Sequence, residues 1–456
     1  MNRLLPRLRG TRRAVLNVSM LRAMSGLSGL ARQVVLYRAF GASGQMDAYF
    51  VVQTVIQSVF GTVDAAISNA MVPVYALRSA VSREEGEHFG RGLFVWVAGL
   101  SIVAFLALLI AAPLWVRAAA PGLTGARMHE ATQLLRVCAV SVVFMSMASV
   151  TAGYLQYAGS FNRAAAMFIP RNVLIAVAAM VLGYRGHGLQ YVGAAVVAGS
   201  LAQLVVLGGR GSFWRTRTWR HLRGDLGDPG IAWTALAALP LLAVFGIGQA
   251  GIVVDRVFGS FLSAGTISNL SYAFAFGTFG ANMFASASTV LLPKLAISAV
   301  QGTTEDMWRT VSRAMCASGM ITAVLLLMMV PGVPYVIALV FGRRAGGSAD
   351  LREITEYVWA FMPWVLGYVV GSVPMQGLVA MNRSGTLLLS GTASLVVVVG
   401  VDSALVSRLG GLGLAIGTSG GVLVNAAVMT YMLHRMVRPS RDYSGPRKLD
   451  SQGGGS

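Results

Sequence analysis

The sequence has few charged residues, and acidic residues are especially scarce. Charged residues make up 12% of the 456-residue chain, and only 17 of them are Asp or Glu. A soluble domain usually carries about 25% charged residues. Apolar residues reach 55%, and the mean hydropathy is +0.66. This composition predicts a protein that spans a membrane many times, and its long apolar runs favour α-helices over the short alternating strands of a membrane β-barrel.

Residues that support catalysis or metal binding are also scarce. The only two cysteines, Cys138 and Cys316, both lie inside apolar runs, and the five histidines are scattered without metal-ligand spacing. No Walker A, nucleophile-elbow or zinc-protease motif occurs. These absences argue against an enzyme, a disulfide framework and a bound metal cofactor, and leave Na⁺ or H⁺ as the only expected ions.

Positive charge is abundant, and its placement indicates topology. The formal net charge is +19, which alone would be compatible with nucleic-acid binding. The basic residues instead cluster between apolar runs, as the positive-inside rule describes. We therefore expect no nucleic acid and a cytoplasmic location for three segments: the N-terminus, the loop at 209–228 and the tail after residue 434. Their basic residues are Arg3, Arg7, Arg9, Arg12 and Arg13; Arg210, Arg215, Arg217, Arg220 and Arg223; and Arg435, Arg438, Arg441, Arg447 and Lys448.

Apolar runs long enough to cross about 30 Å of hydrocarbon number twelve. We interpret the first run as a retained helix, because Arg22 and Arg32 interrupt it and no signal-peptide cleavage site follows. An even number of helices places both termini on one face, in agreement with the charge bias. The expected helices cover residues 14–37, 48–75, 92–116, 133–158, 164–184, 190–208, 231–254, 264–293, 314–341, 355–380, 386–407 and 411–434.

The two halves of the chain resemble each other. In both halves, 89 residues separate a proline from a later Asn-Arg pair: Pro73 from Asn162, and Pro293 from Asn382. Two six-helix halves of the same orientation form a parallel repeat, an arrangement found in alternating-access transporters and also in some channels. We thus predict an all-α protein with an N-terminal lobe (1–208), a basic linker (209–230), a C-terminal lobe (231–440) and a flexible tail (441–456). The matching segments are 37–41 with 255–259, 68–73 with 288–293, and 162–163 with 382–383.

Several ionisable residues fall inside or near the predicted helices, where a charge at mid-depth costs at least about 2.5–3.5 kcal/mol. Four arginines are candidates for a cavity that binds a pyrophosphate, because the guanidinium group can bind two oxygens at once: Arg22, Arg32, Arg38 and Arg256. Arg38 and Arg256 stand near helix ends, so contact with lipid headgroups is an open alternative for them. Asp64 and Asp402 are flanked by apolar residues, and each is expected to pair with an arginine or to bind a coupling cation.

The order of several short motifs resembles the MurJ/MviN family of the multidrug/oligosaccharidyl-lipid/polysaccharide exporter superfamily. The motifs are Gly29–Arg32, Phe40–Ala42, Asp47–Phe50, Val72–Pro73, Ala120–Leu123, Leu134–Arg136, Asn162–Arg163, Val254–Arg256, Ser271–Ala273 and Leu291–Pro293. The resemblance implies two six-helix lobes in a V shape around a cationic cavity that flips a lipid-linked saccharide. It also implies that Arg32 is required in the cavity, and that Asp255, Asp402 and Thr418 occupy positions where some members hold sodium.

The chain departs from the family's lipid II flippases at several cavity positions. Gly26 stands where those flippases have an upstream arginine, and Gln33 stands where they have an aspartate. Their arginine pair of the second helix aligns near Phe60 and Gly61, and their Ala-Asp-Arg run aligns with Ala273–Ala275. Those flippases usually carry two further helices as well. The departures favour an exopolysaccharide or O-antigen unit over lipid II, and both cargoes stay open at this point.

The expected function is a flippase for a polyprenyl-pyrophosphate-linked saccharide in the bacterial cytoplasmic membrane. The expected partners are that substrate and membrane lipids, with a monomeric chain and glycan-synthesis proteins as candidate associates. A cation-coupled multidrug exporter of the same superfamily is the main alternative, and it would need acidic rather than basic residues in the cavity. A scaffold that keeps the fold without transport is a third reading.

Overall fold

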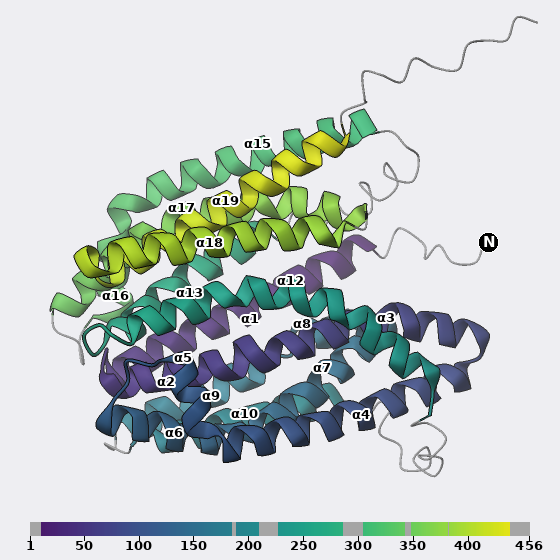
Figure 1. Ribbon diagram of the computed structural model, residues 1–456, viewed down its shortest axis with the longest axis horizontal. Coiled ribbons are helices and arrows are strands. Elements are labelled where there is room, and N and C mark those ends of the chain that lie inside the picture. The colour runs from purple at the N-terminus through teal and green to yellow at the C-terminus, as the bar shows by residue number, and fades with distance from the viewer. Residues whose placement is uncertain are drawn as a thin grey trace, which may run out of the picture.

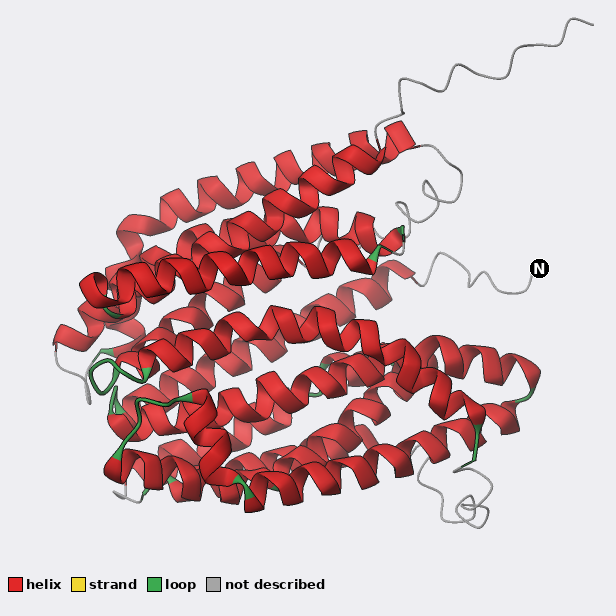
Figure 2. Cartoon of the chain, viewed as in Figure 1, coloured by secondary structure: helices red, strands yellow, loops and turns green. Residues whose placement is uncertain are grey.

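The computed structural model describes residues 11–184, 188–208, 227–285, 304–342, 348–381 and 383–437, and every regular element within these ranges is a helix (Figure 2). Among the described residues, nine helices are long and apolar enough to cross a membrane, and a bent pair at Gly125–Tyr157 brings the number to ten. The prediction of a polytopic α-helical membrane protein is confirmed.

The first half of the chain forms the helices of the N-terminal lobe. Each of the six expected ranges there lies on one or more helices, and several are broken into shorter pieces. They are α1 (Thr11–Phe40), α2 (Gly44–Thr54), the π-helix η1 (Val55–Phe60), α3 (Gly61–Val81), α4 (Arg83–Ile110), α5 (Ala112–Ala119), α6 (Gly125–Ala139), α7 (Ser141–Tyr157), α8 (Phe161–Ala165), α9 (Ile169–Tyr184) and α10 (Gln190–Gly208).

The second half forms the C-terminal lobe. Residues 209–226 of the predicted loop at 209–228, the expected helix end at 286–293 and the tail after 437 lie outside the described residues. The helices are α12 (Pro229–Gly259), α13 (Thr266–Ala285), α15 (Thr304–Met329), the short 3₁₀-helix η5 (Val330–Gly332), α16 (Val333–Phe341), α17 (Ser348–Ala380), α18 (Ser384–Leu409) and α19 (Gly411–Val437).

Several helices begin before the apolar runs that predicted them, and in two of them a serine side chain caps the first turn. Helix α4 begins at Arg83 because the Ser82 side chain accepts a hydrogen bond from the backbone N–H of Glu85. Helix α2 begins at Gly44, where Ser43 caps the N–H of Met46 in the same way. These caps satisfy backbone groups that the first helical turn leaves unpaired. The polar first turns therefore extend the helices beyond the membrane-spanning runs.

The packing of the helices repeats between the two lobes. In the N-terminal lobe α10 packs against α9 and α7, and α7 also packs against α3 and α4; in the C-terminal lobe α19 packs against α18 and α17, and α17 also packs against α13 and α15. Helix α1 lies on α9 as α12 lies on α18. Figure 1 shows the C-terminal helices above the N-terminal ones, with α1 and α12 between them. The spatial arrangement matches the parallel repeat that the sequence predicts, although Pro293 and Asn382 lie outside the described residues.

The lobes are joined at one end of the bundle, which we call the Asp47 end. There α1 ends at Phe40, α2 begins, α12 ends and α13 begins. The Gly122 N–H donates to Ser260 Oγ at 2.8 Å, and the Tyr272 hydroxyl donates to Gly41 O at 3.3 Å. Rings of both lobes pack edge to face, with 5.3 Å between the centroids of Tyr37 and Tyr272. The start of α1 and the end of α19 both lie at the opposite end of the bundle (Figure 1).

Candidate functional site

A cavity of about 270 Å³ lies between the lobes, where α1, α2, η1, α12 and α13 face one another. Its wall combines aromatic side chains with hydroxyls and amides. Among the described residues that line it there is no Asp or Glu, whereas two arginines, Arg32 and Arg256, are present. The polar lining also includes Gln33, Tyr49, Gln53, Thr54, Gln57, Ser58, Gln249, Ser271, Thr278 and Asn282.

Arg32 lies on α1 and is held in the N-terminal lobe by a residue of α9. Its Nη1 donates to Asn172 Oδ1 at 3.1 Å. The Asn172 amide donates in turn to Ser28 Oγ of α1 at 3.0 Å. This network fixes the guanidinium at the cavity wall, because Asn172 is itself 5% exposed and packed between the two helices.

Arg256 approaches the cavity from α12 in the C-terminal lobe. Its Nε donates to Thr54 Oγ1 at 3.2 Å, which bridges the two lobes. Close by, Ser58 Oγ of η1 donates to Gln249 Oε1 of α12 at 3.3 Å. The wider turn of η1 interrupts the α-helical ladder here, and π-helical turns often occur at functional sites. The cavity therefore carries one arginine from each lobe.

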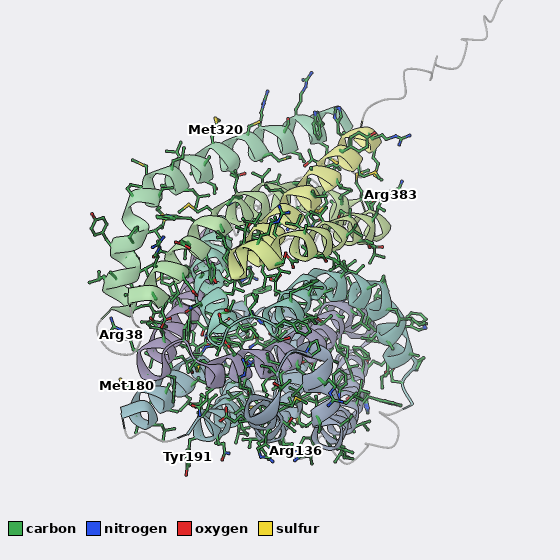
Figure 3. All side chains as sticks on the ribbon, turned by 60° about the vertical axis from the view of Figure 1, so that its left-hand side comes forward. Arg38, Arg136, Met180, Tyr191, Met320 and Arg383 are labelled. Atoms are coloured by element: carbon green, nitrogen blue, oxygen red, sulfur yellow. The ribbon has the colours of Figure 1, made fainter. Side chains whose placement is uncertain are left out.

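The other two predicted arginines lie outside the cavity wall. Arg38 is exposed and donates to the backbone carbonyls of Val340 and Leu339 at 2.8 and 3.1 Å, so it caps the end of α16. Figure 3 shows it at the end of the molecule. Arg22 is exposed on α1 and does not line the cavity. It stands one turn before Gly26, a cavity residue on the same helical face.

Three of the four acidic and hydroxyl candidates meet inside the C-terminal lobe, between α12, α18 and α19. The Thr418 hydroxyl donates to Asp255 at 2.8 Å (Oδ2) and 3.0 Å (Oδ1). The carboxyl of Asp402, which is fully buried, faces that of Asp255 and finds no donor among the described residues. Two ionised carboxylates only accept hydrogen bonds, so this pair requires a proton or a cation between them. Among the described residues no group of three or more His, Cys, Asp and Glu side chains forms a metal site.

Asp64 does not join this group. It is buried on α3 in the N-terminal lobe, near Ser146 of α7. The neighbours Asp255 and Arg256 point in different directions, one into the C-terminal lobe and one to the cavity, because successive helical residues are turned by about 100°.

The sequence patterns do not single out several residues that line or support the cavity. The amides Gln53, Gln57 and Gln249 line the cavity, and Asn172 positions Arg32. Their signal in the sequence is an amide inside an apolar run, with Gln53 and Gln57 four residues apart on one helical face. Asp47 appeared only as part of a motif, although it joins the two lobes through hydrogen bonds to Gly265 and Ser268.

Comparison with known proteins places these features in a family. A family model described as "Lipid II flippase MurJ" matches residues 36–445. The lipid II flippase MurJ of Burkholderia cenocepacia is 28% identical over 309 residues, which are 62% of this chain and 57% of that protein. The probable lipid II flippase MurJ of Vibrio cholerae is 23% identical over 443 residues, or 91% of this chain and 82% of that protein. The match to the Burkholderia protein thus spans little more than half of its length.

Solved structures show the same fold. Lipid II flippase MurJ in an inward closed conformation superposes with a TM-score of 0.78 at 19% identity, covering 91% of this chain and 87% of the other. An inward-facing multidrug resistance MATE family transporter of the MOP superfamily gives a TM-score of 0.76 at 15% identity, covering 92% and 98%. At these identities the likeness concerns the arrangement of helices alone, and the cavity residues must decide between cargoes.

Proposed function

We propose a function for this chain, which belongs to the MurJ family. The chain flips a polyprenyl-pyrophosphate-linked saccharide across the bacterial cytoplasmic membrane by alternating access. The relatives named above are called lipid II flippases. A lipid II-like peptidoglycan precursor is therefore the first cargo to test, and an exopolysaccharide or O-antigen unit is the second.

The positive charge of the residues that line the cavity is the main support for this proposal. Arg32 and Arg256 both line it, and no acidic side chain is among the lining residues that the structure describes. Guanidinium groups bind phosphate oxygens through paired, charge-assisted hydrogen bonds, which are about twice as strong as neutral ones. A pyrophosphate between the two arginines would contact both lobes at once. The surrounding amides and hydroxyls offer donors and acceptors that suit the hydroxyl groups of a sugar.

A multidrug exporter for cationic compounds is the competing function, and the shared fold with MATE transporters makes it a fair comparison. Along the described part of the cavity wall, a cationic drug would meet two arginines and no carboxylate. Like charges at close range cost several kcal/mol in a medium of low dielectric constant. The cavity chemistry therefore favours an anionic cargo.

The orientation proposed for the membrane has both termini in the cytoplasm. The basic segments at the N-terminus, at 209–228 and in the tail support this orientation through the positive-inside rule. The Asp47 end then faces the periplasm, and a substrate enters from the cytoplasmic end. Arg22, on the same face of α1 as the cavity residue Gly26 but one turn nearer that entrance, is proposed to attract the pyrophosphate first.

We further propose that Asp255, Asp402 and Thr418 bind the coupling ion, Na⁺ or H⁺. Their oxygens suit a hard monovalent cation. The facing carboxyls and the absence of a donor to Asp402 among the described residues support the assignment. An ion bound there would contact α12, the helix that also carries Arg256 to the cavity. The ion and the cargo would therefore both shift the conformational equilibrium of this helix.

A flipping assay in proteoliposomes tests the function. The purified protein is reconstituted with fluorescent lipid II or with a lipid-linked exopolysaccharide unit, and externally accessible label is quenched over time. We expect acceleration by the wild-type protein and by Arg136→Ala, an exposed surface arginine, and loss of it in Arg32→Ala and Arg256→Ala. Transport of a cationic dye, together with no flipping of either lipid substrate, would instead favour the drug exporter.

A further inference from the structure

A buried arginine next to the cavity has no part in the function described so far. Arg171 lies in the first turn of α9, is only 6% exposed and does not line the cavity. Its Nη1 approaches Met145 Sδ at 3.3 Å, and its guanidinium carbon lies 5.6 Å from the Phe168 ring centroid. Neither neighbour carries a negative charge. Within the described part of the chain, no carboxylate forms an ion pair with Arg171.

A second cation stands close to it. Asn172, the next residue of α9, accepts the hydrogen bond from Arg32 Nη1, and the charges of Arg32 and Arg171 act on each other. The first turn of α9 adds the positive end of a helix dipole. Two guanidinium groups in this dry environment repel each other and have left water at a high cost. A negative charge between them would offset both effects.

Three buried hydrogen-bond donors in this region lack an acceptor among the described residues: Arg171 Nε, Arg32 Nε and the Tyr49 hydroxyl. Tyr49 is 1% exposed and within the electrostatic range of both arginines. Buried donors are almost always paired in native proteins. The unpaired carbonyl oxygens of Gln33 and Gln203 make no hydrogen bond to them. A water molecule would satisfy the donors but would leave the two charges uncompensated, whereas an anion does both.

We propose that Arg171, Arg32 and the Tyr49 hydroxyl hold a small inorganic anion, with chloride as the physiological ligand, behind the wall of the cavity. Because Arg171 is not exposed to the cavity, a pyrophosphate attached to a lipid does not reach it. Arg32 and Tyr49 belong to both places, so the anion enters from the cavity side. The bound anion fixes the Arg32 side chain and separates it from Arg171.

Chloride-dependent stability of the purified full-length protein in detergent tests this site. Chloride is exchanged for gluconate at constant Na⁺ and constant ionic strength, and the midpoint of thermal unfolding is followed. The midpoint of the wild-type protein and of the surface control Arg136→Gln should rise with chloride and saturate, as linkage requires. Arg171→Gln should remove the rise, and Arg171→Lys should shift it to higher chloride. A wild-type midpoint that is independent of chloride, or an unchanged rise in Arg171→Gln, would overturn the proposal.

Bromide locates the anion without any substitution, which covers the case that Arg171→Gln does not fold. Crystals of the unmodified protein soaked in bromide should show anomalous density beside the Arg171 guanidinium. Density confined to the space between Arg32 and Arg256 in the open cavity would mean that the anion is a mimic of the substrate phosphate, and the separate site would be wrong. Absence of density at both places would equally refute it.

Discussion

The carboxylate of Asp47, in the N-terminal lobe, accepts two hydrogen bonds from Ser268 of the C-terminal lobe. The Ser268 backbone N–H donates at 2.8 Å and its hydroxyl at 2.9 Å, while the Gly265 N–H donates to the other carboxylate oxygen at 2.7 Å. Asp47 therefore caps the N-terminus of α13 across the lobe interface, where the helix dipole also favours a negative charge. At 2% exposure, the carboxylate depends on these donors. This contact closes the Asp47 end, and it must break if the cavity is to open there.

Replacement of Asp47 should release this end of the bundle. Hydrogen bonds to a charged group contribute about 1.5–3 kcal/mol, so Asp47→Ala should shift the equilibrium toward an open Asp47 end by roughly 10- to 100-fold. Double electron–electron resonance measures this opening as the distance between two spin labels. The labels are placed at the exposed residues Glu130 and Arg352 in a variant without Cys138 and Cys316. A distance distribution identical to that of the unsubstituted protein would show that Asp47 does not hold the lobes together.

Gly122 offers an independent test of the same closure. A Cβ atom at this position would lie 2.5 Å from the backbone carbonyl carbon of Ser260, so the lobes approach too closely for any side chain. Gly122→Ala should widen the same label distance and lower the rate of flipping, because the closed state is strained. Gly99→Ala on α4, where a Cβ meets no atom within 4 Å, is the matched control and should leave both readouts unchanged. Equal behaviour of the two variants would contradict the tight contact.

Substitutions of Asn172 should change substrate binding through their effect on the Arg32 guanidinium. Asn172→Ala removes the acceptor of Arg32 Nη1 and should raise the KM for the lipid-linked substrate a few fold through looser positioning. Asn172→Asp keeps an acceptor but adds a negative charge that pairs with Arg32, so it should raise KM more than the alanine variant does. The flipping assay at a series of substrate densities measures both. A smaller effect of the aspartate than of the alanine would mean that Arg32 acts by position and not by charge.

The ion site should show in sodium binding. If Na⁺ occupies the space between Asp255 and Asp402, sodium should raise the unfolding midpoint relative to an organic cation, and Asp402→Asn should abolish the rise. Thr418→Ser keeps the hydroxyl that bonds Asp255 and should retain most of the effect, whereas Thr418→Ala should weaken it. A sodium response that survives in Asp402→Asn would assign the ion elsewhere, and a response to pH alone would identify the coupling ion as H⁺.

The sequence predicted the helices well because burial in lipid imposes long apolar runs that differ sharply from the basic loops between them. It also predicted the repeat, since paired motifs recur at equal spacing. The functional residues were harder to predict, because a position on a helix does not reveal which neighbour the side chain meets. Arg32 and Arg38 are six residues apart on α1, yet one lines the cavity and the other caps α16. The Asp47 contact joins residues more than 200 positions apart, which only the folded chain brings together.

If one arginine from each lobe binds the pyrophosphate of the cargo, the affinity of the protein for that group must depend on both arginines. Binding of undecaprenyl pyrophosphate and of uncharged undecaprenol is measured for the wild-type protein, Arg32→Gln, Arg256→Gln and the double variant. We expect each single substitution to weaken pyrophosphate binding by about tenfold or more, in line with about 1.5–3 kcal/mol for a charge-assisted hydrogen bond, and to leave the uncharged lipid unaffected. Equal affinities of the wild-type protein and the double variant for undecaprenyl pyrophosphate would show that these two arginines do not bind the pyrophosphate.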